Sequence, residues 1–359
     1  MLEIWQGLNA CLNNMERAAL ATIIDVEGSA YRRESTRCLI VESGTIIGAI
    51  SGGCVEGDLQ EHARTMWETG APMMLHYDFR TEEDLVWGLG VGCNGAMTIW
   101  LQPFDPEGRP DEAQAMIGEF HRRLTCTESY TTGVVLETDD PAALPIGSSV
   151  SLSTISGAAG LIDRIVNGIS VKLFVETSRP RPRLLVIGAG ADAVPLVSGA
   201  KALHWHVTLA DHREDYLNRE CFQAADQRVL ASRGTYSECC VKEGDYVVVM
   251  THHYETDRQL VQRLLGLPIR YLGVLGSRKR MERMLAEFRL NAGWNEEALE
   301  KLHAPVGLDI GAESPEEIAL SILCELLSRR NGRSGQPLRS REAPLHSRQS
   351  TGSLRLATQ

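Results

Sequence analysis

The stretch that decides the fold is RLLVIGAGADA, at residues 183–193. An apolar segment ends here in Gly188, Gly190 and Ala193, which have the spacing G-x-G-x-x-A. A strand that ends in this pattern and continues into a helix is typical of dinucleotide-binding domains. In such a loop, Gly188 permits the tight turn, Gly190 lets backbone N–H groups approach a phosphate, and Ala193 permits close packing of helix on strand. The stretch therefore predicts a phosphate-binding loop.

The next apolar segment supplies the acid that usually accompanies this loop. Asp211 ends the segment HVTLAD, 21 residues after Gly190. In a dinucleotide site this carboxylate hydrogen-bonds a ribose diol, so Asp211 is a predicted cofactor-binding residue. The loop itself does not choose a reaction. An alternative is a domain of the same shape that keeps the loop only for packing.

The chain divides into two parts around an Arg-Pro repeat. Beyond it, nearly continuous apolar strands alternate with helical segments, which indicates a parallel sheet covered on both faces. We therefore predict a doubly wound, Rossmann-like α/β domain at 179–330. Before it, strands with few helices indicate a small α+β domain at 1–178. The prolines and arginines of 176–183 predict a stiff, extended connector.

Composition limits the class of protein. The 359 residues are 43% hydrophobic and 23% charged, as in ordinary globular proteins with two or three domains. The net charge of −11 argues against nucleic-acid binding, which needs a basic surface. No signal peptide and no apolar run of about 18 residues is found, so no membrane insertion is expected. Nine cysteines, an odd number at irregular spacing, predict free thiols in the cytoplasm and no structural zinc.

The last segment, 331–359, differs from the rest of the chain. It is rich in serine, arginine, glycine and glutamine and shows no apolar periodicity. It predicts a disordered basic tail. The tail is either simply solvated or a contact for an acidic partner.

Two cysteines lie in glycine-rich turns. Gly52, Gly53 and Cys54 precede a predicted helix, and a thiolate is readily stabilised at a helix N-terminus. Cys93 is followed by Asn94 and Gly95 in a second run of this kind. Each cysteine is either a ligand or a small buried residue at a crowded turn. Because no general base can be placed beside Cys54, we predict a ligand rather than a catalytic nucleophile.

Further polar residues follow other strands of the predicted α/β domain. His252 comes directly after DYVVVM, where it either fixes the loop geometry or contacts a ligand, and Asp257 is expected to support the next helix. The bases that follow Ser277 either clamp an anion or form a solvated face. Ser314 and Glu317 predict a capping box at a helix start.

These motifs, taken together, resemble a known family. The similar segments, in order, are GAISGGCVEGDL, GLGVGCNGAMTIWLQP, RLLVIGAGADA with VTLADHR, VVVMTHHYETD, YLGVLGSRKRMERML and APVGLDIGAESPEEIALSILCELL. In this order they resemble the XdhC/CoxI accessory factors of xanthine dehydrogenase and related molybdenum hydroxylases, over about residues 1–330. The resemblance implies a protein that binds the molybdenum cofactor, protects it, and assists its sulfuration and insertion into an apo-hydroxylase. It implies a maturation chaperone rather than a turnover enzyme.

The chemistry of the residues agrees with this implied role. Molybdenum cofactor, as molybdopterin or its cytosine dinucleotide form, carries a soft metal–sulfur centre at one end and a phosphate at the other. Cys54 and Cys93 are expected to face the metal as transient ligands, while Gly188 and Gly190 take the phosphate. An apo-molybdenum hydroxylase and a cysteine desulfurase are the expected partners, and a homodimer is expected from the frequency of two-fold assemblies.

Two other classes of function remain open on the sequence alone. One is an NAD(P)-dependent oxidoreductase with an N-terminal substrate domain, although no Tyr-x-x-x-Lys proton-donor motif is found. The other is a pure interaction protein with a vestigial nucleotide loop.

Overall fold

The chain forms two compact units, Met1–Pro180 and Arg181–Ser347, called here unit 1 and unit 2. The structure is a computed structural model that describes residues 1–29, 32–53, 55–80, 94–152, 159–290 and 299–341. Each unit is described by itself. Among the described residues, no helix combines the length and the apolar character needed to cross a bilayer.

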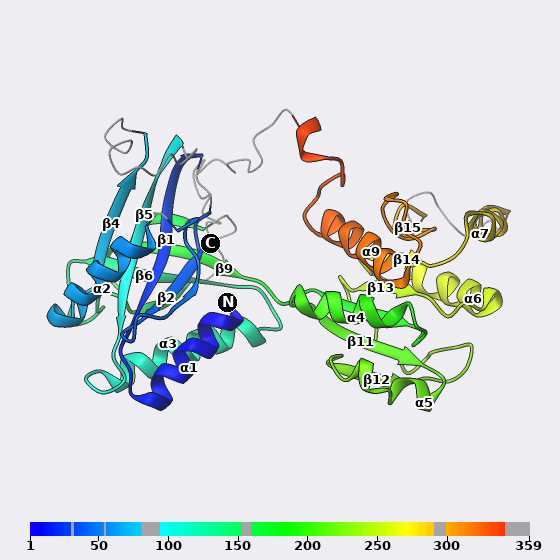
Figure 1. The fold of residues 1–359 in the computed structure, drawn as a ribbon, viewed down its shortest axis with the longest axis horizontal. Helices are drawn as coiled ribbons and strands as arrows, with labels where there is room; N and C mark the ends of the chain where they lie inside the picture. The colour runs from blue at the N-terminus through cyan, green and yellow to red at the C-terminus, as the bar shows by residue number, and fades with distance from the viewer. Residues whose placement is uncertain (30–31, 54, 81–93, 153–158, 291–298, 342–359) are drawn as a thin grey trace. The chain divides into compact units, whose positions relative to one another are not determined.

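Unit 1 contains a five-stranded antiparallel sheet, called sheet A, of order β3-β2-β1-β5-β4 (Figure 1). Its strands are β1 (Ala18–Ser29), β2 (Arg37–Val41), β3 (Ile46–Gly48), β4 (Met73–Asp78) and β5 (Asn94–Phe104). The three helices of this unit are α1 (Leu2–Asn14), α2 (Glu56–Thr69) and α3 (Pro110–Thr125). The helix expected to end at Gly70 does so, because Gly70 takes a left-handed conformation with φ +69°.

Both faces of sheet A are buried, because β1 alternates its apolar residues between them. Ala19, Ala21 and Ile23 pack in one cluster with α2. Ala18 and Leu20 pack in a second cluster with α1 and α3. The two clusters fix which residues of the strands face each helix layer.

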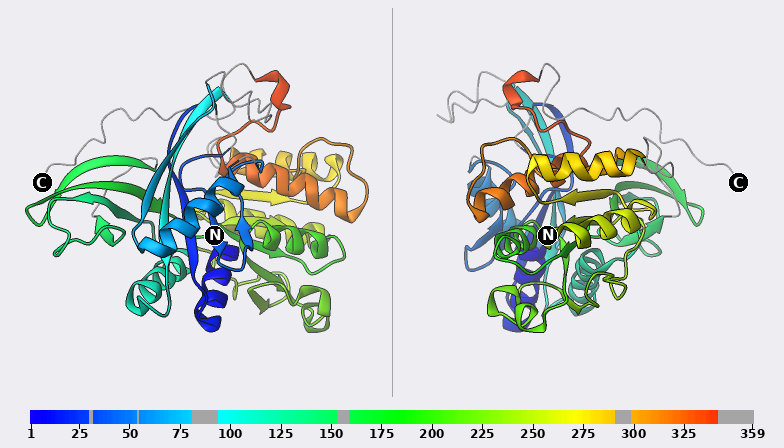
Figure 2. Two further views of the ribbon diagram at one scale, coloured as in Figure 1. Left: turned by 60° about the vertical axis from the view of Figure 1, so that its left-hand side comes forward. Right: turned by 90° about the vertical axis from the view of Figure 1, so that its right-hand side faces the viewer.

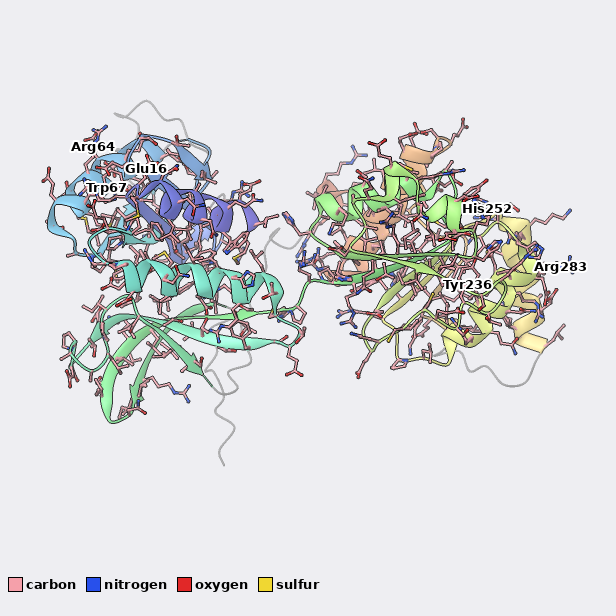
Figure 3. All side chains as sticks on the ribbon, turned by 90° about the horizontal axis from the view of Figure 1, so that it is seen from below. Glu16, Arg64, Trp67, Tyr236, His252 and Arg283 are labelled. Atoms are coloured by element: carbon pink, nitrogen blue, oxygen red, sulfur yellow. The ribbon has the colours of Figure 1, made fainter. Side chains whose placement is uncertain are left out.

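A second antiparallel sheet, called sheet B, completes unit 1 with the order β7-β6-β9-β8. Its strands are β6 (Tyr130–Thr138), β7 (Ser149–Leu152), β8 (Gly160–Val166) and β9 (Ile169–Ser178). Ile24 and Trp100 of sheet A share a small apolar cluster with Leu136 and Phe174 of sheet B. In Figure 3, α3 lies between α1 and sheet B.

Unit 2 is the predicted doubly wound domain. Its six parallel strands have the order β12-β11-β10-β13-β14-β15. These strands are β10 (Arg183–Ile187), β11 (His206–Asp211), β12 (Gln227–Leu230), β13 (Tyr246–Val249), β14 (Tyr271–Val274) and β15 (Leu302–His303). The helical segments are α4 (Ala193–Ala202), α5 (Glu214–Leu217), η2 (Glu220–Phe222), α6 (Tyr254–Leu265), α7 (Arg278–Leu290), α9 (Pro315–Arg330) and η3 (Leu338–Ser340).

Helices cover both faces of this sheet (Figure 2). Leu184 and Val186 of β10 pack with α4 and α9, and Leu185 and Ile187 pack with α6 and α7. Every strand pair is parallel, so the carboxyl ends of the strands share one edge. The predicted fold class is confirmed.

Some local expectations need correction. Residues 176–178 belong to β9 and are not part of the connector, and Glu176 is buried. The helix α3 and the strands β8, β9, β12 and β15 were not expected. In the tail, the described residues through Arg341 include the turn η3, and 342–359 lie outside the described residues.

Candidate functional site

The loops after β10 and β13 meet where the strand order of unit 2 reverses. β10 pairs with β11 on one side and with β13 on the other, and ligands of open α/β sheets bind at such a point. Gly188 has φ +115°, and a Cβ there would lie 2.5 Å from the carbonyl oxygen of Met250. Glycine is therefore required at 188 for two reasons, backbone conformation and close approach.

Three consecutive amides follow this turn. Among the described residues, the N–H groups of Gly190, Ala191 and Asp192 have no hydrogen-bond acceptor. They directly precede α4, which begins at Ala193. Unpaired amides at a helix N-terminus form an anion-binding concavity. The geometry suits the phosphate that the sequence predicts here.

His252 lies beside this loop, a contact that the sequence does not predict. Its Nε2 is 3.3 Å from Asp192 Oδ2, and its ring is the nearest group to a Cβ placed at Gly190, at 3.7 Å. His252, labelled in Figure 3, has φ +61° and a side chain that is 54% exposed. A positive φ is uncommon for a residue with a side chain and occurs often at functional sites.

Asp211 is held inside the protein. Its Oδ2 accepts from the Ala189 amide at 2.7 Å and from Arg213 Nη2 at 2.9 Å, and its Oδ1 accepts from Arg213 Nε at 3.0 Å. Burial acts to raise the pKa of Asp211, but the bonds from Arg213 and the amides hold the pKa below its ordinary value. The carboxylate fixes the loop through Ala189. The ribose contact stays a prediction, and a diol there has to displace Arg213.

A buried network supports the loop after β13. Asp257 is fully buried in the first turn of α6 and accepts a hydrogen bond of 2.6 Å from Thr251 Oγ1. It also pairs with Arg280 of α7. Burial raises the pKa of Asp257 despite these partners. The expected support of the helix by Asp257 is confirmed, whereas its pairing with Arg280 has no signal in the sequence.

The turn before α2 is built by Ser51 and Glu56. Glu56 accepts from the Ser51 amide at 2.9 Å and from the Ser51 hydroxyl, which in turn accepts from the Gly53 amide at 3.0 Å. Burial acts to raise the pKa of Glu56, and the hydrogen bonds from Ser51 lower it below its ordinary value. Gly52 and Gly53 are exposed, and no described atom lies within 4 Å of a Cβ at either position.

The second predicted thiol segment begins at the same end of sheet A. Val55, which follows the first turn, packs in one cluster with Met97 of β5, and Gly95 pairs with Gly28 of β1 two residues before Met97. The backbone of Asn94 begins β5.

Cys54 and Cys93 themselves lie outside the described residues. The structure therefore brings the flanks of the two segments to one sheet end, and the role of the thiols stays a prediction. In the described part of the chain, no group of three or more metal-ligating side chains forms a metal site.

The helix starts predicted in unit 2 are present. Ser314 and Glu317 form the expected capping box of α9. The backbone carbonyl of Ser277 accepts from the amides of Arg280 and Met281, at the start of α7. The anion clamp considered for these bases stays a prediction.

Both parts of the chain match models of one family. The model described as the XdhC Rossmann domain matches residues 184–326, and the model of the XdhC and CoxI family matches residues 11–78.

Relatives match over most of the chain. A protein of Bacillus subtilis (strain 168) named as a probable xanthine dehydrogenase subunit is 32% identical over 333 residues, which are 90% of this chain and 96% of the relative. The molybdenum cofactor insertion chaperone PaoD of Escherichia coli (strain K12) is 24% identical over 312 residues, covering 87% and 83%.

A solved structure has the same fold. The crystal structure of a xanthine dehydrogenase from Bacillus halodurans superposes with a TM-score of 0.73 at 29% identity, covering 92% of this chain and 96% of that one. The order of the motifs, the doubly wound unit 2 and these matches lead to one conclusion: the chain belongs to the XdhC and CoxI family.

Proposed function

We propose that this protein is a maturation factor that binds molybdenum cofactor and delivers it to a xanthine dehydrogenase-type molybdenum hydroxylase. The cofactor is cargo here, so the protein needs a site that both holds and releases it. The proposal includes protection of the cofactor and help with its sulfuration, with a cysteine desulfurase as a further partner. It also includes a cytoplasmic location and a homodimer.

One observation carries the proposal: the unpaired amides of Gly190, Ala191 and Asp192 at the switch point of unit 2. A phosphate accepts hydrogen bonds from such amides and is favoured by the positive end of the helix dipole. The phosphate of molybdopterin or of its cytosine dinucleotide form is the group we assign to them. The relative named a molybdenum cofactor insertion chaperone supports this choice of cargo.

The space around the loop agrees with a bound phosphate. A Cβ at Gly190 would meet only His252 within 4 Å among the described residues, so this face of the loop is open. His252, when protonated, adds a positive charge, and Asp192 lies close enough to orient its ring. By contrast, the contacts of Asp211 with Arg213 do not favour NAD(P) as the ligand.

We assign the metal end of the cofactor to Cys54 and Cys93. The support is the chemistry of thiolates, which are soft ligands for a metal–sulfur centre. The open turn at Gly52 and Gly53 and the shared sheet end with Gly95 are compatible with the assignment.

The test is a binding experiment under anaerobic conditions. Purified protein is mixed with isolated molybdenum cofactor and gel-filtered, and pterin and molybdenum are measured in the protein peak. We expect both to co-elute in equal amounts and to activate an apo-hydroxylase. The proposal fails if nothing co-elutes and the protein instead binds and oxidises NADH with a carbonyl substrate.

A pair of variants tests the phosphate loop. Gly190→Asp places a carboxylate at the open face, and repulsion is expected to lower the retained pterin at least tenfold. Gly266→Asp is the matched control, because Gly266 is also exposed in unit 2 and its nearest described neighbour would be 3.7 Å away. Equal retention by the two variants would contradict the assignment.

A further inference from the structure

Unit 1 contains a cavity that is separate from the site described above. It lies between sheet A, α3 and sheet B and has a volume of about 390 Å³. Sites for small molecules span roughly 300–1,000 Å³ and combine apolar walls with a few polar groups. The apolar walls include the side chains of Leu20, Trp100, Met116, Phe120, Val134 and Phe174.

Two buried arginines line this cavity. The side chains of Arg37 and Arg123 are 7% and 4% exposed, and both pair with the same oxygen of Glu176. Burial lowers the pKa of both guanidinium groups to about 10. A single carboxylate oxygen thus faces two cations in an environment poor in water.

The charges of the surrounding cluster do not cancel. Arg123 also pairs with Glu119, which is shared with Arg122, so the cluster holds three positive and two negative groups. Glu112 at the lining is 70% exposed and lies 3.6 Å from Arg109, so solvent and a partner screen its charge. One positive charge is left over, and a monoanion balances it.

Arg37 has donors left for such an anion. Its Nη1 donates to the Ser35 carbonyl at 3.1 Å and its Nη2 donates to Glu176. Among the described residues, its Nε has no acceptor. A planar guanidinium pairs with a carboxylate through two parallel hydrogen bonds.

We propose that this cavity binds a small aromatic carboxylic acid, with the carboxylate at Arg37 and Arg123. The aromatic body lies among the side chains of Trp100, Phe120 and Phe174. This site is independent of the cofactor loop of unit 2 and of its proposed function.

The first test compares an acid with its neutral analogue. The full-length protein is titrated calorimetrically with 2-naphthoate and with 2-naphthamide, which has a similar shape and no charge. We expect the acid to bind at least tenfold more tightly than the amide. Equal binding of both, or no binding of the acid, overturns the proposal.

The second test closes the cavity from its exposed helix. Ala115 lines the cavity on the exposed side of α3, and Gln114 beside it is exposed and does not line it. Ala115→Trp is expected to weaken naphthoate binding at least tenfold, and Gln114→Trp is expected to leave it unchanged. Equal affinity of the two variants overturns the proposal. Arg37→Gln is expected to remove the preference for the acid; if this variant does not fold, the pair on α3 still decides.

Discussion

Gly188 and His252 both have positive φ, for different reasons. At Gly188, the carbonyl of Met250 leaves no room for a side chain. At His252, a side chain is present, and the backbone energy of its conformation, φ +61°, has to be offset by the surrounding structure. The first residue shapes the loop, and the second is the better candidate for contact with a ligand.

The close approach at Gly188 can be measured as stability. Gly188→Ala is expected to lower the free energy of unfolding of unit 2 by about 2–4 kcal/mol, from strain and from the clash with Met250. Gly244→Ala is the control, because Gly244 also has positive φ but no described atom within 4 Å of a Cβ. Its cost is expected to stay near ~1 kcal/mol. Equal losses in urea unfolding would contradict the assigned clash.

His252 separates function from stability. His252→Gly removes the ring and relieves the positive φ, so the free energy of unfolding is expected to change by less than about 1 kcal/mol. Retention of molybdenum cofactor is expected to fall several-fold, since the ring no longer faces the loop at Gly190. A variant that retains the cofactor like the wild type would assign His252 to loop geometry alone.

At the scale of elements, α9 is fixed to the sheet by a buried carboxylate. Glu325 accepts from Tyr271 Oη at 2.5 Å and from the Gly307 amide at 2.8 Å, and it lies 2.8 Å from His303 Nδ1. Burial acts to raise the pKa of Glu325, but these hydrogen bonds outweigh it and lower the pKa from 4.5 to about 2. The helix is therefore joined to β14, β15 and the loop that follows them.

This carboxylate predicts an acid-sensitive helix. Because the folded pKa of Glu325 lies below its ordinary value, its stabilisation is complete above pH 4.5 and is lost as the pH falls towards 2. Glu325→Gln is expected to lower the stability of unit 2 at neutral pH and to flatten its loss in that window. Glu316→Gln, at an exposed position of the same helix, is the control. Parallel pH curves for the Glu325 variant and the wild type in thermal melts would contradict the prediction.

The arginine pair of unit 1 depends on one strand residue. Glu176→Gln leaves Arg37 and Arg123 without their shared charge, and the loss of stability is expected to be about 3–5 kcal/mol. Glu137→Gln removes an exposed partner of Lys172 on the neighbouring strand, at a cost of less than about 1 kcal/mol. Urea unfolding of both variants decides whether the buried pair carries this weight.

Much of the fold could be predicted at this scale, because the strands of unit 2 are apolar and its helix starts carry strong signals. The strands β12 and β15 escaped because they are short and only partly buried. The helix α3 had a readable pattern, with Pro110 at its first turn and Ala113, Ile117 and Phe120 on its buried face.

The charged cluster of the cavity could not be predicted. Arg37 and Glu176 are 139 residues apart in the chain, and only the pairing of sheets brings them together. The loop of unit 2 was readable because Gly188 and Gly190 act locally. The partners His252 and Asp192 were not, since they come from different loops.

At the scale of the whole molecule, each unit has its own core. The clusters of unit 1 and those of unit 2 share no residue, and the boundary falls between Pro180 and Arg181. Units of this kind fold as separate domains, and a single two-state transition does not describe such a chain.

Calorimetry tests this independence. We expect two thermal transitions, of which Gly188→Ala lowers only one and Glu176→Gln only the other. The double variant is expected to show both shifts unchanged, because the sites lie in different cores. A shift of both transitions by either single variant would show that the units unfold together.

The bond from Ala189 to Asp211 has a consequence for the timing of delivery. A loop fixed by its own buried carboxylate needs no rearrangement when a phosphate arrives, so capture is expected to be fast. The same rigidity gives the carrier no second state from which to expel its cargo. On the proposed function, hand-over is then a competition that the recipient enzyme wins by affinity, and the traffic runs in one direction because the acceptor holds on longer.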